Sequence, residues 1–300
     1  MAFPMGLRVL GLGVLFLLPS VGRAADPQLN TDAIEKAIGK SGQAQEEVYK
    51  ISLPRTDLSI SVEGVRLRPT FALGSWIAFK PMMGKTIAHG DLVLTEEEVG
   101  SVVRQLDQDG IKLTALHNHL IRESPKVMYL HFWAEGEAGQ VAISLRRALA
   151  LTKTPFEKAN VAQTDQSGGE EHLPAERIQE LVGRKGTVKD GVLSIVVPRP
   201  ETVTMSKVEL PPSMGMATAM NFQVGATGKV AATGDFVLAV HEVSGVASAL
   251  VRHGLQVTAL HNHLVHGSPE LYFMHFWAHD TVYSVANGLR AGIDAMKRNP

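Results

Sequence analysis

The sequence predicts an α+β fold: a tandem duplication whose halves each form a mainly antiparallel sheet with flanking helices, related by pseudo-two-fold symmetry. The main observation is a seven-residue stretch, TALHNHL, at residues 114–120 and again at 258–264. HFWA follows each copy, at 131–134 and 275–278, so one offset of 144 residues relates both pairs of motifs. Short apolar runs between glycines and prolines predict the strands, and runs with helical period predict the helices. A repeat at constant offset indicates duplication.

Residues 1–24 have the composition of an export signal. Arg8 supplies the positive region, residues 9–18 the apolar region, and residues 22–24 a small-x-small cleavage site. The apolar run is shorter than a membrane span, so we expect a soluble, periplasmic or secreted protein with no stable membrane anchor in its mature form. The chain has no cysteine, which excludes disulfides and an acylated cysteine.

The first repeat is expected over residues 26–151. It begins with a short helix over 31–38 that ends at Gly39. The strands are expected over residues 48–53, 58–67, 71–79 and 87–94. A helix over 96–109 precedes TALHNHL, and an amphipathic helix over 137–151 follows HFWA.

A polar, glycine-rich linker is expected over residues 152–175, and the plan then repeats over 176–300. The second half is expected to contain a helix over 174–182, strands over 192–197, 216–222 and 229–238, a helix over 241–253 and a closing helix over 281–297.

The two histidine motifs predict a hairpin. Side chains alternate along a strand, so His117 and His119 share one face. Ser124 and Pro125 form a turn pair, and a hairpin centred on Ser124 places His117 opposite His131, with Cβ atoms roughly 4.5 to 5.5 Å apart. The second copy predicts the same for its own triplet, which is His261, His263 and His275.

Three converging imidazoles are the ligand set of a catalytic-type zinc site, which leaves one coordination position open. We therefore expect a divalent transition metal, with zinc favoured; copper, nickel and iron also accept neutral imidazole. The alternative is that the histidines only pack and form local hydrogen bonds. Whether each half binds its own ion or the halves share one site is open at this stage.

Aromatic residues on the histidine face predict the wall of a small-molecule pocket, formed by Trp133 and Trp277. The expected partners are thus a metal ion and a small-molecule ligand. The formal net charge is −1, with 29 lysines and arginines against 30 acidic residues. This balance argues against nucleic acid as a partner, since such proteins carry a basic patch.

Glu98 and Glu242 are the candidate catalytic carboxylates. Thr95 to Glu98 fits a capping box that opens the helix. Position 239, however, is alanine in the second copy, although Glu242 is kept. A carboxylate that persists without the hydroxyl makes a second role plausible, either completing the metal shell or acting as general base.

Two other charged pairs recur at the same offset. Asp91 and Asp235 each follow a glycine and are interpreted as turn formers. Arg55 and Arg199 are interpreted as solvated strand-end residues, with substrate or carboxylate partners as the alternative.

The chain resembles the LppY/LpqO-like exported proteins, a family catalogued as a domain of unknown function. The resemblance lies in G-D-(F/L)-V-L followed by E-V, then G-x-x-(V/L)-T-A-L-H-N-H-L and H-F-W-A, and it covers most of both halves. It implies export and a duplicated architecture, but no established activity. This chain lacks the acylated cysteine of the lipoprotein members.

Three functional hypotheses follow. The first is an exported metal-binding protein for storage, sensing or delivery. The second is a metal-dependent, zinc-type periplasmic hydrolase, in which Glu98 or Glu242 moves a proton from metal-bound water. The third is a sugar- or peptide-binding module without metal. Whether the protein is an enzyme is open; a carrier should close the fourth metal position with a protein ligand, whereas an enzyme should leave it facing a pocket.

Overall fold

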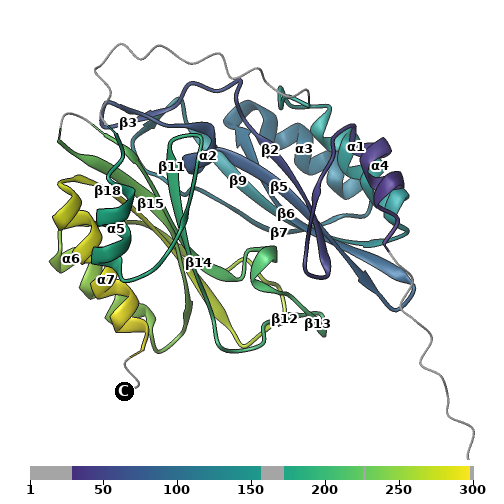
Figure 1. Cartoon of the computed structure of the whole chain (residues 1–300). Coiled ribbons are helices and arrows are strands. Elements are labelled where there is room, and N and C mark those ends of the chain that lie inside the picture. The colour runs from purple at the N-terminus through teal and green to yellow at the C-terminus, as the bar shows by residue number, and fades with distance from the viewer. Residues whose placement is uncertain (1–28, 157–171, 226–227, 298–300) are drawn as a thin grey trace, which may run out of the picture.

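The computed structural model describes residues 29–156, 172–225 and 228–297. The predicted export signal and residues 157–171 of the predicted linker lie outside these described residues. The described chain confirms the α+β fold with two similar six-stranded antiparallel sheets and flanking helices (Figure 1).

The first sheet has the strand order β1-β2-β5-β6-β9-β7. Its strands are β1 (Gln43–Gln45), β2 (Val48–Pro54), β5 (Gly74–Met82), β6 (Lys85–Thr95), β7 (Lys112–His117) and β9 (Val127–Gly136). The helices beside it are α1 (Thr31–Ile38), α3 (Glu96–Gln108) and α4 (Ala138–Leu149). A small sheet and a short helix complete the repeat: β3 (Ser61–Val62), β4 (Val65–Arg66), β8 (Glu123–Ser124) and α2 (Pro69–Ala72).

The second sheet has the matching order β10-β11-β14-β15-β18-β16. Its strands are β10 (Thr187–Lys189), β11 (Val192–Pro198), β14 (Ala217–Val224), β15 (Val230–Ala239), β16 (Gln256–His261) and β18 (Leu271–Asp280). Its helices are α5 (Ala175–Val182), α6 (Val243–Arg252) and α7 (Val282–Met296). The smaller elements are β12 (Thr204–Met205), β13 (Val208–Glu209), β17 (Gly267–Ser268) and the 3-10 turn η1 (Pro212–Met214).

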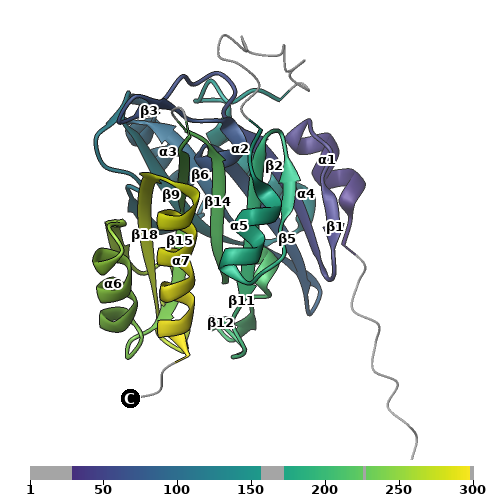
Figure 2. The same cartoon turned by 60° about the vertical axis from the view of Figure 1, so that its left-hand side comes forward.

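The two sheets face each other, and the helices lie on the outer sides (Figures 1 and 2). Each repeat has its own core between helices and sheet. Two further cores combine residues of both repeats: one contains Trp133 with Met205 and Phe273, and the other contains Tyr129 with Trp277. The inner faces are therefore buried against each other, and side chains on those faces meet across the repeat boundary.

Two expected strands differ from the prediction. The expected strand over 58–67 is a tight hairpin of β3 and β4, because Glu63 and Gly64 adopt positive φ values of 50° and 81° at its turn. The expected strand over 71–79 starts later, since Pro69 opens the short helix α2.

The predicted hairpin register is wrong by two residues. Ala115, and not His117, lies opposite His131, while His117 lies opposite Tyr129. The second repeat has the same register, with His261 opposite Phe273. The shift preserves the face of each histidine because alternate residues of a strand share a face.

No helix within residues 29–156, 172–225 and 228–297 combines the length and the hydropathy needed to cross a bilayer.

Candidate metal centre

The six histidines of the two motifs lie together between the sheets. Each histidine of one repeat stacks on one of the other: the ring centroids are 3.6 Å apart for His117 and His261, 3.8 Å for His119 and His275, and 3.7 Å for His131 and His263. We call these six residues the histidine cluster. The two triplets therefore interlock in one cluster and do not lie in separate places.

Different local structures hold the members of the cluster. His131 and His275 lie on β9 and β18, the strands next to the sheet edges, and His117 and His261 end the edge strands β7 and β16. His119 lies in the loop beyond β7, where the Thr258 hydroxyl of the other repeat donates to its carbonyl oxygen at 2.5 Å.

The asparagine of the first motif also joins the two repeats. Asn118 Nδ2 donates to Leu120 O at 2.9 Å and to Thr258 O at 3.2 Å. The middle residue of HNH therefore fixes the backbone between two cluster histidines and does not face the cluster.

Aromatic rings close both ends of the stacked histidines. Tyr129 lies 3.4 Å from the His119 centroid, and Phe273 lies 3.7 Å from that of His263. The Tyr129 hydroxyl donates to Ala72 O at 2.8 Å. These rings restrict the positions that the imidazoles can take.

Burial keeps the cluster neutral. It lowers the pKa of all six imidazoles, and charge repulsion from neighbouring histidines lowers the pKa of five of them further. The pKa of His117 falls to about 3. Neutral imidazole is the form that binds metals.

The Nε2 atom of every cluster histidine is buried and has no hydrogen-bond partner within the described part of the chain. For His117 the tautomer follows from geometry, since Nδ1 lies 3.1 Å from Asn118 O, which only accepts. His275 Nδ1 likewise lies 3.3 Å from Gly234 O. In these two rings Nδ1 carries the hydrogen, and Nε2 presents a lone pair.

Buried ring nitrogens without hydrogen-bond partners are costly, and six such Nε2 atoms in one place fit a bound cation. Two groups have ligand atoms within 4.8 Å of one another: His117 with His261, His263 and His275, and His117 with His119 and His131. The donor set fits a nitrogen-preferring metal ion. Because His117 belongs to both groups and the first group draws on both repeats, the two triplets are not independent sites.

Asp91 and Asp235 border the cluster, which corrects their interpretation as turn formers. They lie within β6 and β15, directly opposite His131 and His275. Asp91 Oδ1 is 3.8 Å from His131 Nε2. Burial raises the pKa of Asp91 well above its ordinary value, assisted by repulsion from Asp235, and raises the pKa of Asp235 to about 7. A usable signal existed, since each aspartate interrupts an apolar strand run at the same repeat position.

Glu98 lies in a buried ion pair. Its carboxylate accepts from Arg55 Nη1 at 2.8 Å and Nη2 at 3.1 Å, and from the backbone nitrogens of Thr95 at 2.9 Å and Lys153 at 3.0 Å. Arg55 is fully buried, so its interpretation as a solvated residue is wrong and the carboxylate-partner alternative is confirmed.

Glu242 repeats this arrangement. It accepts from Arg199 Nη1 at 2.7 Å and from the Ala239 backbone nitrogen at 2.6 Å. Glu242 is the N-cap residue of α6 but makes no capping hydrogen bond with its side chain; the carboxylate instead binds the backbone at Ala239, just ahead of the helix. Neither Glu98 nor Glu242 belongs to the metal-competent groups found among the described residues, and a catalytic role for them stays a prediction.

Trp133 and Trp277 pack in the two cores between the repeats. Their indole nitrogens donate to Glu135 at 2.7 Å and to Glu63 at 3.1 Å. Neither lines the cavity beside the cluster, and their role as a pocket wall also stays a prediction.

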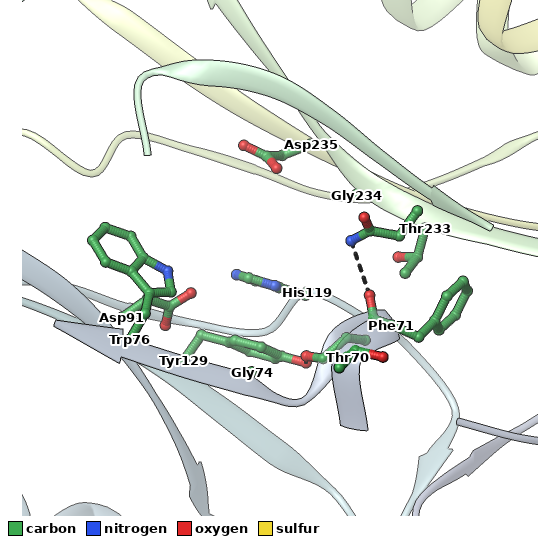
Figure 3. A pocket seen from close by; sticks show the side chains of 12 residues that line it. Thr70, Phe71, Gly74, Trp76, Asp91, His119, Tyr129, Thr233, Gly234 and Asp235 are labelled. Carbon is green, nitrogen blue, oxygen red and sulfur yellow. Dashed lines mark hydrogen bonds between the residues drawn. The ribbon is translucent and has the colours of Figure 1, made fainter. Parts of the chain in front are cut away.

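A cavity of about 220 Å³ lies beside the histidine cluster, between the repeats. Figure 3 shows Asp91 and Asp235 on opposite walls, with His119 between them. The lining residues are Thr70, Phe71, Ala72, Gly74, Trp76, Asp91, His119, Tyr129, Asn221, Thr233, Gly234 and Asp235. The comparison of the two repeats did not identify Trp76 as a site residue, because this tryptophan does not recur in the second repeat.

Comparison with known proteins identifies the repeats but no activity. Residues 32–151 and 176–295 each match the family model described as Domain of Unknown Function (DUF1259). No curated protein matches the chain. Similar solved structures include a trimeric bacterial microcompartment shell protein, PduB, at 7% identity and a TM-score of 0.22, covering 86% of this chain and 91% of that one. EtuB from Clostridium kluyveri is similar at 8% sequence identity and a TM-score of 0.21, and the match covers 85% of this chain and 89% of EtuB. TM-scores this low support no conclusion about the fold or the function of this chain.

Proposed function

The chain belongs to the family described as Domain of Unknown Function (DUF1259) and carries that domain twice, and we propose that it binds a divalent transition metal ion at the histidine cluster. One observation carries the proposal: six buried Nε2 atoms converge between the repeats without a hydrogen-bond partner among the described residues. The alternative is that the histidines only pack and form local hydrogen bonds. In that case these nitrogen atoms would have hydrogen-bond partners.

The donor set favours zinc. All six candidate ligands are neutral imidazoles, which suit zinc, copper, nickel and iron, whereas magnesium and calcium prefer oxygen. The four-histidine group would close a tetrahedral shell around an ion, as in a structural or storage site. The three-histidine group includes His119, which lines the cavity, and would leave one position open.

The proposal includes export. The composition of residues 1–24 and the motifs shared with the LppY/LpqO-like proteins support a periplasmic or secreted location and a place in that lineage. A role in metal storage, sensing or delivery outside the cytoplasm is consistent with a buried site made only of imidazoles.

Elemental analysis of the purified full chain tests the metal centre. We expect bound zinc or another transition metal in the wild type and a lower metal content in His117→Ala, because His117 belongs to both groups and its removal leaves at most three imidazoles in either. The matched control is His241→Ala, an exposed histidine outside the cluster, which should keep its metal. Absence of metal from wild type loaded with each candidate ion would reject the proposal and favour a metal-free binding module.

A metal-dependent hydrolase is the second candidate, favoured by the cavity that reaches His119 and two buried carboxyl groups. A metal ion bound there would supply Lewis acidity and a nucleophilic water. Asp91 and Asp235 are the carboxylates at hand, since Glu98 and Glu242 are held by arginines. Screening ester, phosphoester and lactone substrates with wild type and Asp235→Asn tests this. The hydrolase is supported if wild type turns over a substrate and Asp235→Asn does not, although the variant keeps its metal. If no substrate is turned over, the metal-carrier hypothesis is favoured.

A further inference from the structure

The repeats differ at one place beside the histidine cluster. Trp76 pairs with Asp91 across β5 and β6, whereas Ala219 pairs with Asp235 across β14 and β15. Ala219 therefore stands where the first repeat has Trp76. By the same pairing, Thr233 stands where the first repeat has His89, and Ser194 where it has Lys50. Three large side chains of the first repeat thus correspond to three small ones in the second.

In the first repeat the large side chains pack on one another. The Trp76 indole lies against Gly215, where an added Cβ would be 3.1 Å from the ring. The His89 ring centroid is 5.7 Å from that of Trp76, and Lys50 Nζ lies 4.1 Å above the indole. Lys50 also donates to Ser213 O at 2.9 Å. The space on this side of the cluster is therefore filled.

On the other side lies the cavity of about 220 Å³, whose lining includes Thr233, one of the three small residues, and also Trp76. Thr233 lines it at the place of His89, and Tyr129 lines it where the second repeat has Phe273. Divergence of the two halves has thus opened one of two equivalent spaces and placed polar groups in its wall.

The wall offers polar groups that both donate and accept hydrogen bonds. Asp91 Oδ1 and Thr70 Oγ1 are buried and have no partner within the described chain, and Asp91 is 7% exposed. Thr233 donates its hydroxyl hydrogen to Phe276 O at 2.8 Å, so its oxygen can only accept from a ligand. Asn221 Nδ2 is engaged by Phe71 O at 3.0 Å. Asp235 adds a second carboxyl group on the opposite wall (Figure 3).

This wall excludes two ligand classes. An anion would find no lysine or arginine among the described lining residues, and a charge buried without a partner is costly. An apolar ligand would leave buried polar atoms unsatisfied, at a cost of about 1–3 kcal/mol each. Polar groups that lie on several walls and both donate and accept need a ligand whose own groups do both at several positions; a single ammonium group only donates, whereas several hydroxyl groups meet this need.

We propose that this cavity binds a small polyhydroxylated molecule, of about monosaccharide size, beside His119. The proposal rests on the proposed function, in that it names the ligand class met at the open side of the metal centre. The cavity holds the volume of roughly seven water molecules, at about 30 Å³ each.

Saturation-transfer NMR on the metal-loaded full chain tests the proposal, with D-glucose and glycerol as polyol probes and methylammonium and acetate as the cationic and anionic probes. We expect saturable binding of at least one polyol. Ala219→Trp adds the first repeat's own side chain beside Asp235, the lining residue that Ala219 pairs with, and should weaken that binding by about tenfold or more. The matched control, Val240→Trp, adds a tryptophan at a site that is 65% exposed and should bind as wild type does.

A second variant guards against misfolding of Ala219→Trp. Asp235→Asn keeps the shape of the side chain and should also weaken polyol binding, with circular dichroism confirming the fold of each variant. Polyol binding that survives both changes overturns the assignment, as does saturable binding of only methylammonium or only acetate.

Metal content, measured on the same samples, separates this inference from the proposed function. Retained metal without binding of either polyol overturns the ligand assignment and leaves the metal centre intact. Cavity-dependent polyol binding in protein that takes up no metal supports the ligand assignment and rejects the metal centre.

Discussion

Replacing Arg55 should destabilise the protein strongly. The guanidinium is fully buried and donates to Glu98, to Val93 O at 2.6 Å and to Asp57 at 2.8 and 2.9 Å. Arg55→Met removes the cation but leaves the buried Glu98 carboxylate without it. Removing one partner of a buried ion pair costs about 3–5 kcal/mol of unfolding free energy. At roughly 2–4 °C per kcal/mol for a chain of this size, the melting temperature should fall by roughly 6–20 °C.

The second repeat supplies a matched comparison. Arg199→Met should destabilise in the same direction but by less, because its partner Glu201 is 46% exposed by side chain and Glu242 accepts from one arginine nitrogen. Urea unfolding followed by circular dichroism, on chelator-treated protein at pH 7, measures both. Chelation removes the contribution of metal binding to stability.

The same ion pair predicts a pH dependence. Burial alone would raise the pKa of Glu98, but hydrogen bonds from Arg55, Lys153 and Thr95 outweigh it and lower the pKa below its ordinary value. A lowered folded-state pKa stabilises above the unfolded-state value of about 4.3, and this contribution is lost as the pH falls through the folded-state pKa. The stability difference between wild type and Glu98→Gln should therefore shrink below about pH 4.

Two results would refute this reasoning. One is an unfolding free energy of Arg55→Met within about 0.5 kcal/mol of wild type, a change typical of surface substitutions. The other is a Glu98→Gln variant that is as stable as wild type but binds no metal. That result would support the earlier prediction that Glu98 is a metal ligand or general base.

Three further predictions follow from the site and the sheets. Zinc at about 100 times its wild-type dissociation constant should raise the unfolding free energy by about 2.7 kcal/mol in wild type and by less in His117→Ala, which thermal unfolding measures; an equal rise in both contradicts the metal centre. Gly90→Ala should cost about 1–3 kcal/mol, because its Cβ would lie 2.4 Å from a carbonyl of the facing strand, whereas Gly100→Ala, with open space around it, should not destabilise. Thr258→Val removes the hydrogen bond to His119 O between the repeats and should cost about 1–3 kcal/mol in urea unfolding; unchanged stability would show that this contact is dispensable.

Local patterns predicted much of the fold. Helical period placed α1, α3, α4 and α7 to within a few residues, and alternation placed His117 and His131 on one face of the first sheet. The prediction of the shared face held despite the error in register, because a shift by two residues moves a side chain along the same face and not to the other face of the sheet.

The charged residues show where sequence reasoning stopped. Arg55 and Glu98 are 43 positions apart, and no local pattern indicates that folding buries them as a pair. Asp91 was interpreted as a turn former from its preceding glycine, yet that glycine serves close strand packing, and the aspartate faces His131 within the sheet. Both errors concern tertiary contacts that no local pattern indicates: Arg55, just after β2, binds Glu98 on α3, and Asp91 on β6 lies beside His131 on β9.

The sequence by itself determined the duplication, the secondary structure and the chemistry of two histidine triplets, because periodicity and residue type are local properties. Only the tertiary structure decided that the triplets interlock in one cluster, since that depends on two inner faces burying each other. It also decided that one side of the cluster is open. The cavity exists only because Trp76 and Asp91 of the first repeat and Asp235 of the second line the same space between the repeats.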